Sequence, residues 1–164
     1  MYYSNLFFVF SILGFIIEKL FNINRDSGIL YGFWTPIYGI GVCITIFIFN
    51  KINSKINLKG FKKLAISFLI GFVILSLLEY IGGFSVEHLL RISFWDYSNE
   101  KFNIGKYTSL RMALIWGISS IGIIYLIKPL TKKWIYKIPN FVTYILITLY
   151  TIDSMLTLSP YLIN

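Results

Sequence analysis

KKLAISFLIGFVILSLLEYIG, residues 62–82, is a long apolar run that indicates what kind of fold this chain adopts. After the two lysines it continues for nineteen residues with a single acidic or basic side chain, Glu79. A bilayer core about 30 Å thick is crossed by roughly 20 apolar residues of helix. The apolar residues are continuous and do not alternate with polar ones, which favours a helix over a barrel strand. The stretch therefore predicts a transmembrane helix.

The composition extends this prediction to the whole chain of 164 residues. Hydrophobic residues make up 57% of it and charged residues only 13%, about half the charged share of a typical soluble domain. Its mean hydropathy is +0.73. We predict an all-α, polytopic transmembrane bundle of five helices that forms a single integral membrane domain over residues 1–164. The five predicted spans cover residues 3–21, 35–50, 62–82, 109–127 and 140–160.

Several kinds of chemistry lack the residues they would need. Cys43 is the single cysteine and has no neighbouring ligands in the sequence, so we expect no disulfide and no metal site. No Gly-x-x-x-x-Gly-Lys-Ser/Thr loop is present, and ATP-driven work would need a separate subunit. We expect no cofactor. Nucleic-acid binding is not expected either, because five spans leave no room for a soluble basic domain.

Lysines indicate the topology. Two of the predicted connections carry nine lysines and no acid, and by the positive-inside rule these connections face the cytoplasm. This predicts a cytoplasmic N-terminus and an outer C-terminus. The positive charge would meet anionic lipid headgroups or an acidic partner surface. The nine are Lys51, Lys55, Lys59, Lys62, Lys63, Lys128, Lys132, Lys133 and Lys137.

Of the charged residues inside the predicted spans, four come out at similar depths near the outer ends, namely Glu18, Glu79, Arg111 and Asp153. A lone charge in lipid costs about 2.5–3.5 kcal/mol on insertion scales, so we expect Arg111 to pair with at least one of the acids. Two interpretations stay open. The cluster is a structural ion-pair network, or it lines a cavity open to the outside that handles an ion, a proton or a polar solute.

Small and polar residues recur beside these charges at helical spacing, which predicts that each stripe faces other helices. The predicted stripes are Ser11, Gly14, Glu18 and Asn22; Ser76, Glu79 and Gly83; Tyr150, Asp153 and Thr157; and Arg111, Ile115, Ser119 and Gly122.

The connection between the third and fourth spans has a pattern of its own. SVEHLLRISFW, residues 85–95, predicts an amphipathic helix in the outer interface, where Trp95 and Tyr97 suit the aromatic belt. A turn at Asn103–Gly105 follows, and Thr108 or Ser109 offers an N-cap for the fourth span. The stretch is either a belt with a turn or a lid over the charge cluster, to which Asp96 and Lys106 would then contribute. His88 is a proton relay or an ordinary interfacial histidine.

A family resemblance arises from five motifs: FWDYS, FNIGKY and LRMALIWG, together with GILYGFWTPIYGIG and EYIGG. Over about residues 10–125 the chain resembles the ABC-transporter type IV (CmpB-like) family of bacterial membrane permeases. The resemblance implies a transport component in the bacterial cytoplasmic membrane, with an ATPase as a separate partner. The outer-loop residues that match are Trp95, Asp96, Tyr97, Ser98, Asn103 and Gly105.

We interpret the chain as a permease-like subunit, not an enzyme, that contacts membrane lipid and forms a homo-oligomer. The residues predicted to bind substrate are Glu18, Glu79, Glu87, His88, Asp96, Arg111 and Asp153. One alternative is a membrane enzyme acting on lipid or envelope precursors, with Glu79, Glu87, His88 or Asp96 as acid and base. Another is a non-catalytic assembly or sensory subunit.

Overall fold

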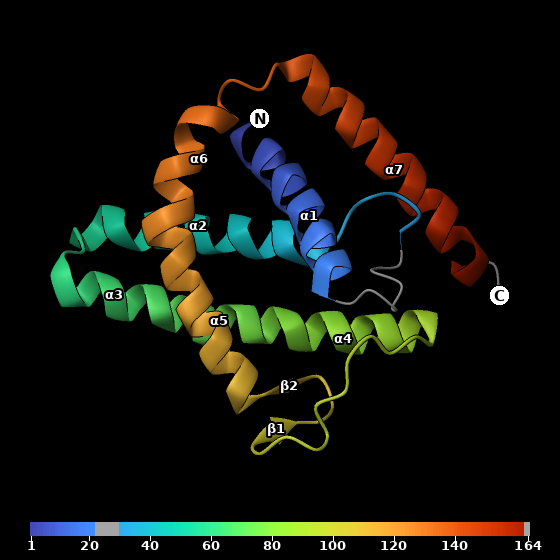
Figure 1. The fold of residues 1–164 in the computed structure, drawn as a ribbon, viewed down its shortest axis with the longest axis horizontal. Coiled ribbons are helices and arrows are strands. Elements are labelled where there is room, and N and C mark those ends of the chain that lie inside the picture. Colours follow the sequence, from blue (N-terminus) through green and yellow to red (C-terminus); the bar gives the residue numbers. More distant parts are fainter. Residues whose placement is uncertain (22–29, 163–164) are drawn as a thin grey trace. The chain divides into compact units, whose positions relative to one another are not determined.

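The computed structural model describes residues 1–21 and 30–162, most of which are helical (Figure 1). The apolar runs become helices because a helix satisfies its backbone hydrogen bonds within a single segment. The elements are α1 (Tyr2–Phe21), α2 (Pro36–Ile56), α3 (Gly60–Leu69), the π-helix η1 (Ile70–Leu75), α4 (Ser76–Leu90), β1 (Asn103–Ile104), β2 (Thr108–Ser109), α5 (Leu110–Gly122), the π-helix η2 (Ile123–Ile127), α6 (Lys128–Ile135) and α7 (Asn140–Leu162).

Five helices in the described residues are long and apolar enough to cross a membrane. They span Tyr2–Leu20, Pro36–Ile56, Gly60–Leu90, Leu110–Ile135 and Asn140–Tyr161, which confirms the predicted all-α class with five spans. The third and fourth are longer than predicted because α3, η1 and α4 run on as one helix, and so do α5, η2 and α6.

The separate amphipathic helix predicted over residues 85–95 is not shown. Residues 85–90 are instead the last turns of α4, since no proline breaks the helix after Gly83. Arg91 ends it in the left-handed conformation, with φ at 59°, and its N–H donates to the Glu87 carbonyl at 2.9 Å. Residues 92–102 then continue without helix.

The helices gather in two compact units, and the single-domain prediction for residues 1–164 stays a prediction. Unit 1 comprises residues 1–43 and 130–164, and unit 2 comprises residues 44–129. In unit 1, Gly39 lies against Phe7 and Ser11, and Gly14 lies against the Tyr38 ring, so α1 packs closely along the first turns of α2.

The other contacts of unit 1 hold α7. Asn5 on α1 is 2% exposed and accepts a hydrogen bond from the Thr143 hydroxyl on α7. Its amide also donates to the Ile135 carbonyl at 3.3 Å. Further along the same helices, the Tyr150 ring meets Phe7 and Phe8 edge-to-face at centroid distances of 5.4 and 5.9 Å. Polar and aromatic contacts together therefore join α1 and α7.

Unit 2 is built on the crossing of α5 with the rod formed by α3, η1 and α4 (Figure 1). Glycine allows the close approach: Gly71 of η1 lies against the Trp116 carbonyl and Ser120 of α5, and Gly117 of α5 lies against the Phe68 ring. A Cβ at either glycine would collide with these atoms. Small residues at a helix crossing bring the backbones together, as is usual in membranes.

Two cation–π contacts link the lysine-bearing segments of unit 2, which lie far apart in the sequence. Lys63 Nζ lies 4.2 Å from the centroid of the Tyr125 ring on η2, and Lys128 Nζ lies 4.6 Å from that of Phe49 on α2. The two lysine-bearing segments, far apart in sequence, therefore meet. We call Lys51, Lys55, Lys59, Lys62, Lys63 and Lys128 the lysine end.

Candidate functional site

Glu79 on α4 is the most buried acid of unit 2, with 4% of its surface exposed. Its carboxylate accepts hydrogen bonds from the Tyr97 hydroxyl at 3.1 Å and from the Thr108 hydroxyl at 2.9 Å. Among the described residues, no lysine or arginine forms an ion pair with it. Glu79 is thus a buried carboxylate held by neutral donors.

Both donors to Glu79 come from residues 91–109, which we call the strap. The strap folds back on α4: the Trp95 ring packs on Gly83, and the Trp95 indole donates to the Tyr107 carbonyl at 2.9 Å. The β1–β2 hairpin, which turns at Gly105 with φ at 58°, brings Thr108 to the carboxylate. The FWDYS and FNIGKY motifs therefore fold together over one buried acid.

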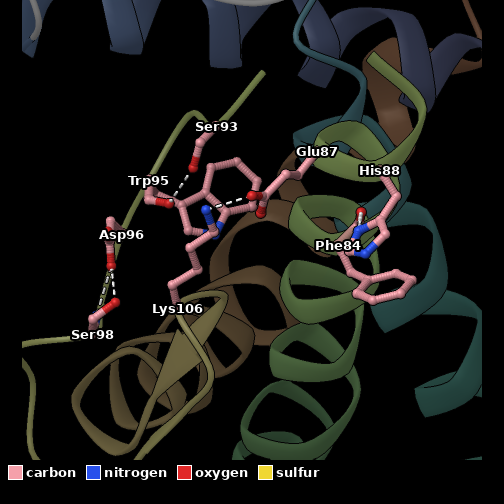
Figure 2. Close-up of polar contacts among 8 residues, drawn as sticks. All are labelled: Phe84, Glu87, His88, Ser93, Trp95, Asp96, Ser98 and Lys106. Atoms are coloured by element: carbon pink, nitrogen blue, oxygen red, sulfur yellow. Dashed lines mark hydrogen bonds and ion pairs between the residues drawn. The ribbon is translucent and has the colours of Figure 1, made fainter. Parts of the chain in front are cut away.

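An ion pair at the edge of the strap involves Glu87 and Lys106, whose carboxylate oxygen and amine lie 2.5 Å apart (Figure 2). This contact holds the pKa of Lys106 above its ordinary value. Asp96 accepts bonds from the hydroxyl and the N–H of Ser98, and these lower its pKa. Glu87 and Asp96, which were predicted as site residues, are thus held by Lys106 and Ser98 of the strap.

His88 turns toward its own helix (Figure 2). Its ring stacks on Phe84 at a centroid distance of 3.9 Å, and its Nδ1 lies 2.9 Å from the Phe84 carbonyl oxygen. The His88 ring thus packs on Phe84 of its own helix, and the proton-relay role of His88 stays a prediction.

Arg111 does not pair with one of the three predicted acids in the described structure, and its partner is Glu100 at 3.1 Å. Glu100 also accepts from the Ser109 hydroxyl at 2.5 Å. The arginine side chain is 76% exposed because it lies off the packed face of α5. That face carries Ala113, Gly117 and Ser120, so the stripe predicted on this span lies on roughly the opposite side of the helix.

Asp153 on α7 is the corresponding buried acid of unit 1, with 9% of its surface exposed. It accepts from the backbone N–H groups of Tyr31 and Gly32 at 3.0 and 2.8 Å and from the Trp34 indole at 2.8 Å. The Thr157 hydroxyl donates a fourth bond at 3.2 Å. The carboxylate therefore anchors the segment that precedes α2.

The remaining predicted residues divide between the units. Glu18 is half-buried in unit 1 and interacts with the Tyr38 hydroxyl. Ser11 and Thr157 are buried on the predicted faces, whereas Asn22 lies outside the described residues. Because Glu18 and Asp153 belong to one unit, and Glu79 and Arg111 to the other, a single four-charge cluster stays a prediction.

The sequence predicted Glu79 and Asp153 among seven site residues but did not predict the groups that hold them. Tyr97 and Trp34 lie in motifs quoted above and Thr108 was an N-cap candidate, but nothing in their spacing indicates a bond to a distant carboxylate. Within residues 1–21 and 30–162, no three histidine, cysteine or acidic side chains gather as metal ligands would.

By its fold, this chain is a multi-pass membrane protein in which buried carboxylates anchor the connecting segments. The chain belongs to the family described as "Putative ABC-transporter type IV", which it matches over residues 5–158. This confirms the resemblance and extends it almost to both ends of the sequence. No curated protein and no solved structure matches the chain.

Proposed function

We propose that this chain is the permease-like membrane subunit of an ABC-type transporter and that a small polar or cationic solute is handled at Glu79. Family membership supports the transport role. The observation that carries the site is a buried carboxylate with neutral donors only, which leaves its negative charge available to a cationic group. Buried ionisable residues in membrane helices are functional sites by default.

In this proposal the strap closes the site. Tyr97 and Thr108 reach Glu79 from the strap, so releasing the strap would free both carboxylate oxygens at once. Asp153 would do the same for the segment before α2 in unit 1. The strap would lie on the outer face of the bacterial cytoplasmic membrane, with the N-terminus inside and the C-terminus outside.

In this proposal, a separate ATPase subunit binds at the lysine end, and its ATP hydrolysis drives transport. Lys51, Lys55, Lys59 and Lys62 are exposed there, and the segment from residue 51 to 63 contains no acid. A surface of one charge sign selects a partner of the opposite sign. The functional assembly would contain two or more copies of this chain.

The docking step is tested by reversing Lys59 and Lys62 together to glutamate. Membranes are extracted gently, and native mass spectrometry records the subunits that copurify with each variant. We expect an ATPase subunit with the native chain and its loss from the double variant. The control is Lys101→Glu, which changes an exposed lysine of the strap. Retention of the same ATPase by the double variant would contradict docking at the lysine end.

The solute site is tested by Glu79→Gln, which keeps the shape of the side chain and removes its charge. The same spectra show small molecules retained by the complex, and the variant should lose a species that the native protein carries. Glu100→Gln is the matched control, since it removes an acid of the strap that pairs with Arg111. Equal retention in all three proteins would exclude Glu79 as the binding carboxylate.

A further inference from the structure

At or next to the contact between η1 and α5 lie buried polar groups that make no complete hydrogen bond. Ser120 on α5 is 0% exposed, and its hydroxyl makes no hydrogen bond. The Ser76 hydroxyl, at the start of α4, and the Trp116 indole N–H are also buried and make no complete hydrogen bond. A buried polar group with no partner costs about 1–3 kcal/mol.

Three other helical hydroxyls of this chain avoid that cost by a hydrogen bond to their own helix. Ser67, Thr148 and Thr151 each donate to the carbonyl four residues earlier, at 2.8, 3.0 and 2.8 Å. Ser76 and Ser120 do not use this route, although each has a preceding helical turn. Ser11 on α1 and Thr45 on α2 are also buried without a bond, so what distinguishes Ser76 and Ser120 is where they lie.

The place is marked by π-helix. Ser76 directly follows η1, and Ser120 lies three residues before η2. A π-helical turn widens the helix and changes the carbonyl positions around it, and such turns are frequent at functional sites. Gly71 of η1 lies against Ser120 and the Trp116 carbonyl, so Ser120 lies at a crossing where the two helices touch.

Glu79 stands at one end of this row. It follows Ser76 by three residues, which places both on one face of α4, and Trp116 interacts with its carboxylate without completing a hydrogen bond. On α5, Ser120 lies one turn beyond Trp116 and against Gly71, so polar groups on the two helices lead from Glu79 toward the lysine end where α3 begins.

We propose that the η1–α5 interface opens to admit water, and that Ser76, Trp116 and Ser120 then line an aqueous path leading from Glu79 into unit 2. Water can donate to and accept from each of these groups, so hydration removes the cost of the closed arrangement. The path would take small polar or cationic solutes. This inference deepens the proposed function and rests on it for the solute class alone.

The opening is tested by cysteine accessibility. Cys43, the only cysteine, is replaced by alanine, and single cysteines are introduced as Ser76→Cys and Ser120→Cys. Membranes are treated with 2-aminoethyl methanethiosulfonate, a small cationic reagent, and intact mass measures modification. The control is Ala113→Cys, because Ala113 is 8% exposed on the packed face of α5. We expect both serine positions to react at least tenfold faster than position 113.

A second pair of variants separates opening from local disturbance. Adding Ser120→Ala to Ser76→Cys removes one orphan hydroxyl, which favours the closed state and should slow labelling several-fold. Adding Ser67→Ala removes a hydroxyl that is bonded to the Lys63 carbonyl, and labelling should not slow.

Equal labelling at positions 76, 113 and 120, or no slowing by Ser120→Ala, would overturn the inference. The assay requires neither an ATPase nor an identified solute. Its result is therefore independent of the docking and retention experiments: the η1–α5 interface can prove to open when the proposed ATPase or solute is not found, and it can prove to stay closed when they are.

Discussion

Replacing Asp153 should release the segment before α2, because this carboxylate accepts from three N–H groups there. Asp153→Ala leaves the N–H groups of Tyr31 and Gly32 and the indole of Trp34 without their acceptor. Each buried donor left unpaired costs about 1–3 kcal/mol. The two backbone groups are only partly buried, so we expect a total of about 3–5 kcal/mol.

Hydrogen exchange read by mass spectrometry measures this effect directly. The Tyr31 and Gly32 amides should be protected in the native protein and should lose most of that protection in Asp153→Ala. Asp153→Asn keeps one acceptor oxygen and should lose less. Thr157→Val removes only the hydroxyl bond at 3.2 Å and serves as the matched control on the same helix.

A thermodynamic cycle with Trp34→Phe isolates the indole bond. If Asp153 and Trp34 interact as the 2.8 Å distance indicates, the two substitutions together should cost less than the sum of the single effects. Native protection at Tyr31 and Gly32 in Asp153→Ala would refute the reasoning, since it would show that other contacts hold this segment.

Further expectations concern unit 2. Gly71→Ala places a Cβ against the Trp116 carbonyl and should destabilise by about 1–3 kcal/mol, whereas Gly122→Ala meets open space and should be neutral or stabilising; thermal unfolding in detergent compares them. Thr108→Val removes one of two bonds to the buried carboxylate of α4, so exchange of the strap amides should quicken severalfold, and unchanged rates would contradict this anchor. Because the pKa of Lys106 is raised in the folded protein, its ion pair with Glu87 stabilises the strap fully below pH 10.5 and is lost as the pH rises through the raised pKa. Because the pKa of Asp96 is lowered, its hydrogen bonds with Ser98 stabilise the strap fully above pH 3.8 and are lost as the pH falls through the lowered pKa. Strap exchange, corrected for its intrinsic pH dependence, should therefore be constant from about pH 5 to 9.

The strap and α5 show where sequence reasoning reached its limit. Thr108 or Ser109 was predicted as the N-cap of the fourth span, and the Ser109 hydroxyl accepts from the Met112 N–H at 3.3 Å, because capping depends on neighbours three residues away. Arg111 was predicted to face inward, and it lies outside, paired with Glu100. A charge in a predicted span indicates that a partner is needed, but does not say which loop supplies it.

The sequence alone is enough to predict the five apolar helices, the family, and a set of charged positions in the spans that includes Glu79 and Asp153. Length and hydropathy predict the helices and five short motifs indicate the family, and all of these signals lie in neighbouring residues. Tertiary contacts determine that these two acids are buried and which groups hold them, because Thr108 meets Glu79 across 29 positions and Gly32 meets Asp153 across 121. Such contacts depend on where a connecting segment returns to its helix, and no local periodicity records that return.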